Sequence, residues 1–200
     1  VNGLVGSEMC IRDSTRTVRS TRTNVRQVGW WDPLAQSFLL EQQGGTYVTA
    51  VDIFFGTKDT NIPISMQIRP MENGYPTKDI LPFSDVTIEP SGVEVSENAS
   101  IATRFVFPAP VYIPQSEEHC FVLFSDSNEY KVWISRMGDI DISGTRTISE
   151  QPYAGVLFKS QNASTWTADQ YEDLKFTLYR ATFNTSVTGR AVFNLSLIHI

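Results

Sequence analysis

Few residues of this 200-residue chain could carry out nucleophilic or metal chemistry. The chain has two histidines and two cysteines, and His119 and Cys120 stand side by side at the start of an apolar run. A nucleophile–histidine–acid site would depend on His119, and no second His or Cys stands at the spacing that a zinc site needs. We therefore expect a packed or surface His119, a Cys120 that points into the core, no cofactor and no enzymatic activity.

Two pairs of carboxylates lie close together in the sequence, Asp139 with Asp141 and Glu172 with Asp173. In an extended segment, Asp139 and Asp141 share a face. Together with backbone carbonyls they could bind calcium, or they could flank a glycosidic bond. Neither spacing is diagnostic, and solvated loop acids are the ordinary interpretation. Asp139 and Asp141 are therefore weak calcium candidates.

The segment from Gln151 to Tyr171 is the best candidate for a binding surface, because regular alternation is lost there and irregular segments often carry function. Its candidate residues are four aromatic rings and a nearby amide, namely Tyr153, Phe158, Trp166, Tyr171 and Asn162. Such residues suit a protein interface or a sugar ring. Three interpretations stay open: a subunit interface, a cap on the protein's own core, and a glycan-binding surface.

The sequence predicts that β-strands position these residues. The clearest is Ile62–Arg69, where Ile or Met occupies every second position, as in a half-buried strand. Tyr47–Phe55 is apolar on nearly both faces, so we expect a more central position, and Gly44-Gly45 before it predicts a tight turn. With Leu34–Leu40, these runs should form the inner part of a sandwich.

Further short strands follow along the chain. We predict them at Lys78–Phe83, Val86–Ile88, Ala102–Phe107, Val111–Ile113, His119–Ser125, Tyr130–Ser135, Val156–Phe158 and Leu174–Phe183. The run His119–Ser125 is nearly all apolar and should be central, whereas Ala168–Leu174 predicts one helical turn. About nine short strands separated by turns are typical of an all-β, antiparallel β-sandwich of jelly-roll type.

The domain organisation is simple, with one domain and an arm. Residues 1–14 and 195–200 resemble translated sequencing-adapter sequence, so we expect them to be non-native and the natural protein to continue beyond them. Residues 15–29 alternate Ser, Thr, Arg and Val without an apolar face, which predicts an extended or disordered arm. Residues 30–194 should form the sandwich.

Charge is distributed unevenly between the arm and the domain. Of 16 Lys and Arg, five precede residue 29, which leaves 11; of 22 Asp and Glu, two precede it, which leaves 20, so residues 29–194 carry a net charge of −9. This charge opposes nucleic-acid binding by the sandwich, because phosphate would be repelled. The arginines of the arm could contact nucleic acid, but without aromatic residues they favour a solvated linker or contact with an acidic neighbour. No apolar run approaches the roughly 18 residues of a membrane span.

Several ordered strings carry a resemblance to a known family. They are Asp32–Phe38, Gly44–Phe55, Ile62–Arg69, Glu72–Pro76, Asn128–Tyr130 with Trp133, Gln151–Gly155 and Leu157–Thr167. Together they resemble a module of large virion structural proteins of contractile-tailed bacteriophages, over roughly residues 16–193.

This resemblance implies a non-catalytic part of a tail, baseplate or fibre, assembled in the host cytoplasm and located in the virion. Its partners would be other virion subunits or further copies of itself. A carbohydrate-binding module for host attachment is the alternative, and a glycan-cleaving enzyme is a distant third.

Overall fold

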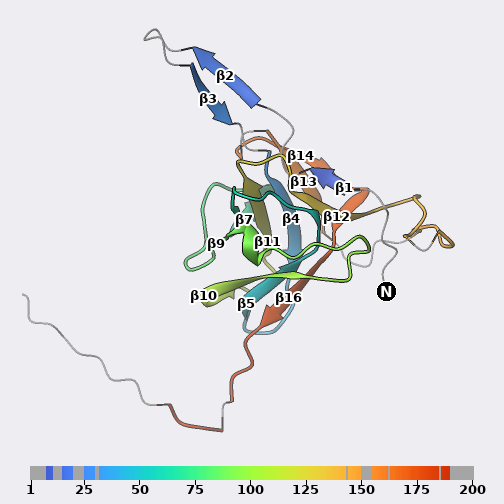
Figure 1. Cartoon of the computed structure of the whole chain (residues 1–200). Coiled ribbons are helices and arrows are strands. Elements are labelled where there is room, and N and C mark those ends of the chain that lie inside the picture. Colours follow the sequence, from blue (N-terminus) through green and yellow to red (C-terminus); the bar gives the residue numbers. More distant parts are fainter. Residues whose placement is uncertain are drawn as a thin grey trace, which may run out of the picture.

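The computed structural model describes residues 8–10, 15–19, 25–29, 32–142, 144–149, 155–161, 163–184 and 186–189. The described part consists largely of β-strands, and the ladders between these strands are antiparallel. The helical element among these residues is one short 3-10 turn, η1, at Pro90–Gly92. Two layers of sheet pack against each other (Figure 1). This arrangement confirms the predicted all-β antiparallel sandwich.

The first layer has the strand order β14-β13-β4-β11-β7-β8, and β9 also pairs with β7. Its strands are β14 Trp166–Asp169, β13 Leu157–Ser160, β4 Leu34–Leu39, β11 Glu118–Ser125, β7 Ile64–Glu72, β8 Tyr75–Pro76 and β9 Val86–Ile88. Strand β11 pairs with β4 on one side and β7 on the other, so Phe121 stands opposite both Gln36 and Ile68. The predicted central position of this apolar strand is confirmed.

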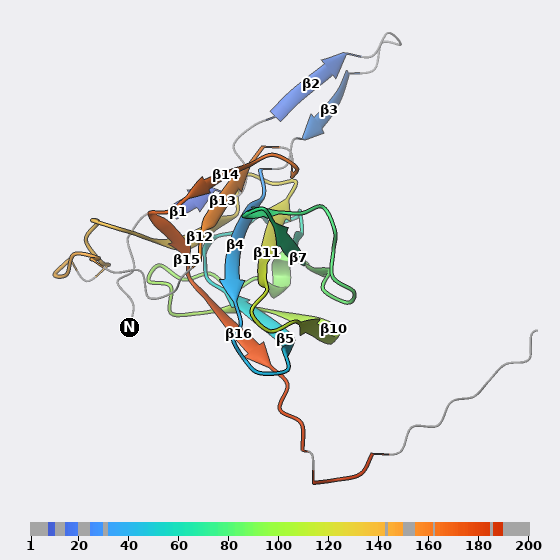
Figure 2. The same cartoon turned by 180° about the vertical axis from the view of Figure 1, so that it is seen from behind.

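The second layer consists of two sheets, one in which β5 is central and one in which β12 is central. Its strands are β10 Thr103–Ile113, β5 Thr46–Ile53, β6 Phe55–Thr57, β12 Lys131–Arg136, β15 Glu172–Leu174 and β16 Phe176–Arg180. Strand β5 lies between β10 and β16, and farther along β12 pairs with both β6 and β15 (Figure 2). Strand β1, Glu8–Cys10, pairs with the segment Lys131–Trp133 of β12.

The chain passes repeatedly from one layer to the other. Strands β4, β7, β11 and β13 belong to the first layer, and β5, β10, β12 and β15 between and after them belong to the second. This alternation is the jelly-roll-like feature of the fold. It explains how residues far apart in sequence come to share one core.

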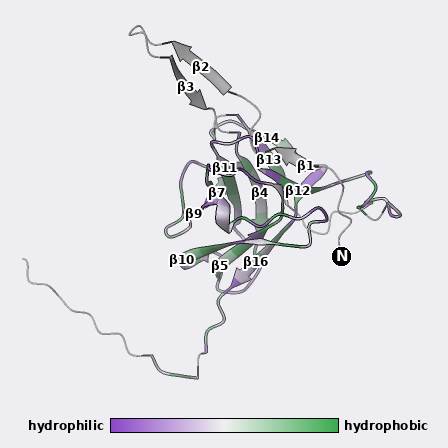
Figure 3. Cartoon of the chain, viewed as in Figure 1, coloured by the Kyte–Doolittle hydropathy of each residue, from purple (hydrophilic) through white to green (hydrophobic). Residues whose placement is uncertain are grey.

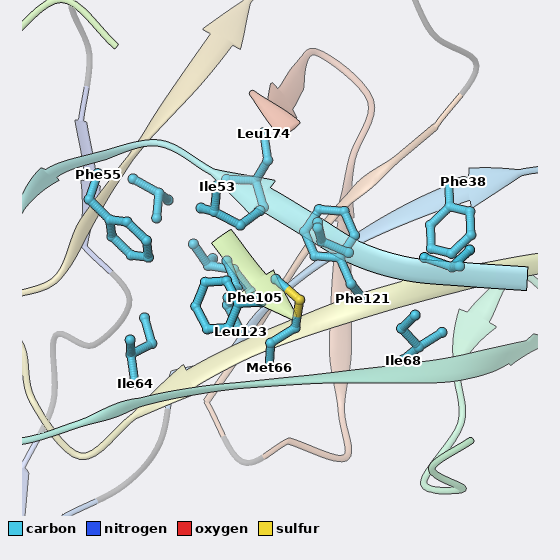
Figure 4. Packing of buried hydrophobic residues seen from close by; sticks show 14 of the residues in the cluster. Phe38, Ile53, Phe55, Ile64, Met66, Ile68, Phe105, Phe121, Leu123 and Leu174 are labelled. Carbon is cyan, nitrogen blue, oxygen red and sulfur yellow. The ribbon is translucent and has the colours of Figure 1, made fainter. Parts of the chain in front are cut away.

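The main core fills the space between the layers (Figure 4). Ile64, Met66 and Ile68 of β7 are fully buried there, as their alternation predicts, whereas Ile62 before the strand is partly exposed. Phe121 of β11 contacts Phe38 of β4 at 6.4 Å between ring centroids and Phe176 of β16 at 5.1 Å. Each large apolar side chain buried in this way stabilises the fold by about 1.5–3 kcal/mol.

A second, smaller cluster covers the outer face of the first layer. Its buried members are Ala35, Cys120, Val122, Phe158 and Trp166. The central strands β4 and β11 are therefore buried on both faces. Apolar segments occur along strands of both layers (Figure 3).

Several predictions of secondary structure were wrong or incomplete. Lys78–Phe83 forms no strand, because the hydroxyl of Ser84 occupies the place of a strand neighbour beside β7. It accepts a hydrogen bond from the amide of Ile68 at 3.0 Å and donates to the carbonyl of Ile68 at 3.1 Å. Ala168–Leu174 forms no helical turn. Its first residues end β14, which pairs with β13, and its last residues form β15, which pairs with β12.

The segments 102–107 and 111–113 are joined in one strand, β10, with a register shift between Val106 and Val111. Pro108 and Pro110 lie within this shift, where a residue without an N–H group can be accommodated. The expected arm contains two paired strands, β2 Thr15–Arg19 and β3 Val25–Gly29, which fits their Thr and Val content. Residues 8–10, excluded as non-native, take part in a ladder as β1.

Truncating the ring that joins three strands should destabilise the fold strongly. Phe121→Ala should lower the free energy of unfolding by about 3–5 kcal/mol, because it removes buried surface and leaves a cavity. Urea denaturation followed by tryptophan fluorescence measures the loss. The matched control is Phe183→Ala, a substitution at an exposed ring, which should cost less than about 1 kcal/mol. Equal losses in the two variants would contradict this account of the core.

Candidate functional site

The outer side of the second layer carries a group of apolar and aromatic side chains, which we call the tyrosine face: the exposed Tyr47, Val106, Tyr112 and Phe183, and the half-buried Tyr179. Tyr47 and Tyr112 are direct cross-strand partners on β5 and β10, with ring centroids 5.1 Å apart. The ring of Phe183 meets Tyr47 edge-on at 5.2 Å. Tyr47, Tyr112 and Phe183 are 41%, 46% and 61% exposed.

The Gly44-Gly45 turn shapes one end of this face. Both glycines have positive φ, as predicted, and the Gly45 amide donates to the Gln42 carbonyl at 3.0 Å. A Cβ on Gly45 would lie 2.6 Å from the Tyr112 ring, so only glycine allows this ring to pack over the turn. The Tyr112 hydroxyl donates to the Gly44 carbonyl at 3.2 Å, which fixes the ring further.

A closed polar cluster forms the other end of the face. The Arg104 guanidinium donates to both carboxylate oxygens of Asp52, at 2.7 and 2.9 Å, and lies 4.1 Å from the centre of the Tyr179 ring. The Tyr179 hydroxyl donates to Asp52 at 2.9 Å. The hydrogen bond from Arg104 lowers the pKa of Asp52 below its ordinary value. The charges of Arg104 and Asp52 therefore satisfy each other on the sheet, and the aromatic rings remain the groups open to a partner.

The orientation of the rings limits what they can bind. The planes of Tyr47 and Tyr112 meet at 50°, and those of Tyr47 and Phe183 at 83°. These rings share no common plane, so they do not form a flat platform for several sugar units. Rigid aromatic side chains at varied angles instead suit the irregular surface of another protein.

A second group of interacting side chains lies where the two layers meet, and we call it the ion cluster: Arg136, Lys159, Asp169 and Glu172. Glu172 of β15 is buried and accepts hydrogen bonds from Arg136 of β12, with Nε at 2.6 Å, and from Lys159 of β13 at 2.6 Å. Lys159 also bonds Asp169 of β14 at 2.9 Å. The ion cluster thus ties β13 and β14 of the first layer to β12 and β15 of the second.

Hydrogen bonding in the ion cluster outweighs the effect of burial on its charges. Burial acts to lower the pKa of Lys159, but the hydrogen bonds to Glu172 and Asp169 raise it overall. For the carboxylate of Asp169, burial acts in the opposite direction and raises the pKa, but hydrogen bonds from Lys159 and the Tyr171 amide lower it overall. Both groups are therefore held in their charged forms, so the cluster acts as a structural tie.

The predicted binding residues do not come together as one surface. Phe158 and Trp166 are buried in the cluster on the outer face of the first layer, and the exposed ring of Tyr75 meets Phe158 at 6.0 Å. Tyr171 is 70% exposed in the turn between β14 and β15. Tyr153 and Asn162 lie outside the described residues. Phe158 and Trp166 therefore match the core-capping interpretation.

The weak calcium candidates lie in a turn after β12. Asp139 faces Arg136 at 3.9 Å, and the Asp141 carboxylate accepts a hydrogen bond from the Arg146 amide at 3.4 Å. Over the part of the chain that the structure describes, no three or more His, Cys, Asp or Glu side chains are grouped so that they could hold a metal ion.

His119 and Cys120 are both buried on β11 and point to opposite faces of the strand. The Nδ1 atom of His119 lies 3.2 Å from the Glu117 carbonyl oxygen, and the Cys120 thiol donates to the Arg69 carbonyl at 3.6 Å. Cys120 does pack in a core, but in the outer cluster rather than between the layers. Burial raises the pKa of its thiol to about 12, so the reactive thiolate is scarce at neutral pH.

Sequence reasoning missed the tyrosine face. Tyr47 belongs to a run that is apolar on both faces, which gives no sign that its ring points outward. The usable signal was the alternation of Val111, Tyr112 and Ile113, which places the ring of Tyr112 away from the core. The pairing of Tyr112 with Tyr47 depends on the strand register.

Comparisons with known proteins do not identify a family: no family model matches the chain, and no curated protein matches it. The residues that the structure describes include no helix that is long and apolar enough to span a membrane.

Removing the charge of Glu172 should weaken the tie between the layers. Glu172→Gln should lower the free energy of unfolding by about 1–3 kcal/mol, because Arg136 and Lys159 lose a buried, charged acceptor. Chemical denaturation measures this change. Asp139→Asn, which removes a longer and more exposed pair, is the control and should change stability by less than about 0.5 kcal/mol. A Glu172→Gln variant as stable as the control would show that the ion cluster is not a structural tie.

Proposed function

We propose that this chain is a non-catalytic structural module of a tailed-phage virion, belonging to the tail, baseplate or fibres, and that it docks other virion subunits through the tyrosine face. The observation that carries the docking proposal is the exposure of Tyr47, Tyr112 and Phe183 on the outside of a sheet whose inner side is already filled. The virion assignment comes from the resemblance in the ordered sequence strings.

The tyrosine face has the properties of an interface centre. Tyrosine is enriched among the residues that dominate binding energy, and its ring loses little conformational freedom on binding. The contacts of Tyr112 with the Gly44-Gly45 turn and of Tyr179 with Asp52 hold two of the rings in place before a partner arrives. Such preorganisation reduces the entropy cost of association.

The chemistry of the remaining side chains supports a role without turnover. Glu172 is committed to Arg136 and Lys159, and Asp52 is committed to Arg104 and Tyr179. The Cys120 thiol is buried. In these three groups, the side chains that could act as acid, base or nucleophile are occupied by packing or ion pairs.

Particle incorporation tests this proposal. In a phage that carries this coding sequence, the double variant Tyr47→Ser/Tyr112→Ser should fold but be depleted from purified particles, because each lost ring should weaken docking by about 10-fold or more. Immunoblotting of particles measures incorporation, and circular dichroism of the purified variant checks folding. The matched control is Tyr171→Ser, an exposed tyrosine on another part of the molecule, which should be incorporated normally.

Three outcomes would count against the proposal. Absence of the protein from wild-type particles would exclude a virion role. Normal incorporation of the double variant would exclude the tyrosine face as the docking site. Glycan-array binding that is lost in the double variant would instead favour carbohydrate recognition at the host surface.

A further inference from the structure

We propose that Asp173 acts as a proton-responsive latch between the two layers, so that uptake of one proton by this side chain removes a buried charge and stabilises the packing of β15 against β4. The proposal concerns the interior of the fold and is independent of the docking function. Asp173 is 7% exposed although it lies on the short strand β15. One of its carboxylate oxygens, Oδ1, accepts a hydrogen bond from the Gln36 side-chain amide at 2.9 Å.

The second oxygen of Asp173 is the unusual feature. Oδ2 is buried and has no hydrogen-bond partner among the residues that the structure describes. An ionised carboxylate in this position loses hydration that a single hydrogen bond does not replace. A proton on Oδ2 would remove the buried charge and leave the bond from Gln36 to Oδ1 in place.

Gln36 connects this carboxyl to both layers. While its amide nitrogen donates to Asp173, its oxygen accepts a hydrogen bond from the Leu174 backbone amide at 2.9 Å. Gly155 packs so closely that a Cβ there would lie 2.7 Å from the Gln36 amide nitrogen. Gln36 therefore has little room to move, and a change of charge on Asp173 acts directly on the contact between β4 and β15.

The charged groups around Asp173 do not compensate its charge. Glu172 on the same strand bonds Arg136 of β12 and Lys159 of β13. Asp169 of β14 adds a negative charge that opposes ionisation of Asp173. Lys175 donates to the Ala99 carbonyl at 2.8 Å and stands over the Phe54 ring. No ion pair joins Asp173 to a cation among the described residues.

These surroundings set the pH window of the latch. Burial is the main cause that raises the pKa of Asp173 from 3.8 to about 6. Because the folded-state pKa lies above the unfolded value, the stabilising contribution of Asp173 is fully present below 3.8 and is lost as the pH rises through about 6. Asp52 and Asp169 have lowered pKa values, so their contributions are lost only in more acidic solution.

Nuclear magnetic resonance of the full chain tests the latch directly. The side-chain amide signals of Gln36 should shift with pH and show a midpoint near 6. In Asp173→Asn this titration should disappear, and thermal denaturation at about pH 8 should show a Tm higher by about 5 °C. The Tm advantage should shrink at about pH 5, where the wild-type side chain is already protonated. Asp79→Asn, at an exposed carboxyl, is the control and should leave the Gln36 titration unchanged.

Either of two results would overturn the proposal. A Gln36 midpoint below about 4.5 in the wild type would show that Asp173 titrates like an ordinary carboxyl. A midpoint near 6 that persists in Asp173→Asn would assign the titration to another group. The midpoint of the wild-type protein can be measured even if Asp173→Asn fails to fold.

Discussion

The burial of β4 and β11 on both faces is the constraint on which the rest of the structure depends. Between the layers, Phe38 and Phe121 pack against the second sheet, and on the outside Ala35 and Val122 lie beneath Phe158 and Trp166. Burial of both faces fixes the register of β4 and β11 in the sheet. A slip of one residue would move every inward side chain to the outer face. The outer surface of the first layer is thus largely occupied by the protein's own side chains.

The outer surface of the second layer is covered in part, because Phe54, Ala99 and Trp133 form a small apolar cluster beside β12. Over β5 and β10 the outer surface is more open. There the polar groups satisfy each other, as Asp52 does with Arg104, and the aromatic rings of Tyr47 and Tyr112 remain exposed. The difference between the two outer surfaces is the structural reason to place docking on the second. The same sheet supplies rigidity, since its inner side contributes Val51, Ile53 and Phe105 to the main core.

Polar side chains in the interior take the places that regular strand pairing leaves open. Ser84 bonds both backbone groups of Ile68, and Gln36 accepts the amide hydrogen of Leu174. Arg69 is buried beside Gln67, whose side-chain oxygen accepts from it at 2.8 and 3.2 Å, and burial lowers the pKa of Arg69. Buried polar groups of this kind must be paired, and Asp173 is notable because only one of its oxygens is.

The sequence allows prediction of the strands whose apolar residues alternate or form a continuous run. Ile64, Met66 and Ile68 are buried as expected, and β11 is central. Prediction failed where residues far away in the sequence decide whether a segment forms a strand. Ser84 replaces a strand beside β7, and the segment after Trp166 is drawn into two strands by β13 and β12. Such effects depend on the tertiary arrangement and have no local signature.

The candidate site was less predictable for a related reason. Aromatic content suggested Phe158 and Trp166, but content alone does not tell an exposed ring from a buried one, and both are buried. The exposed pair Tyr47 and Tyr112 arises from the register between β5 and β10. The direction in which a ring points follows from alternation, whereas its neighbour across the sheet follows from the whole fold.

Hydroxyl-radical footprinting of the chain inside phage particles, compared with the purified chain, tests the central claim most directly. If the tyrosine face is the docking surface, Tyr47, Tyr112 and Phe183 should lose most of their oxidation in the particle, while Tyr171 should keep its own. Protection of Tyr171 with unchanged oxidation of Tyr47 and Tyr112 would contradict the account.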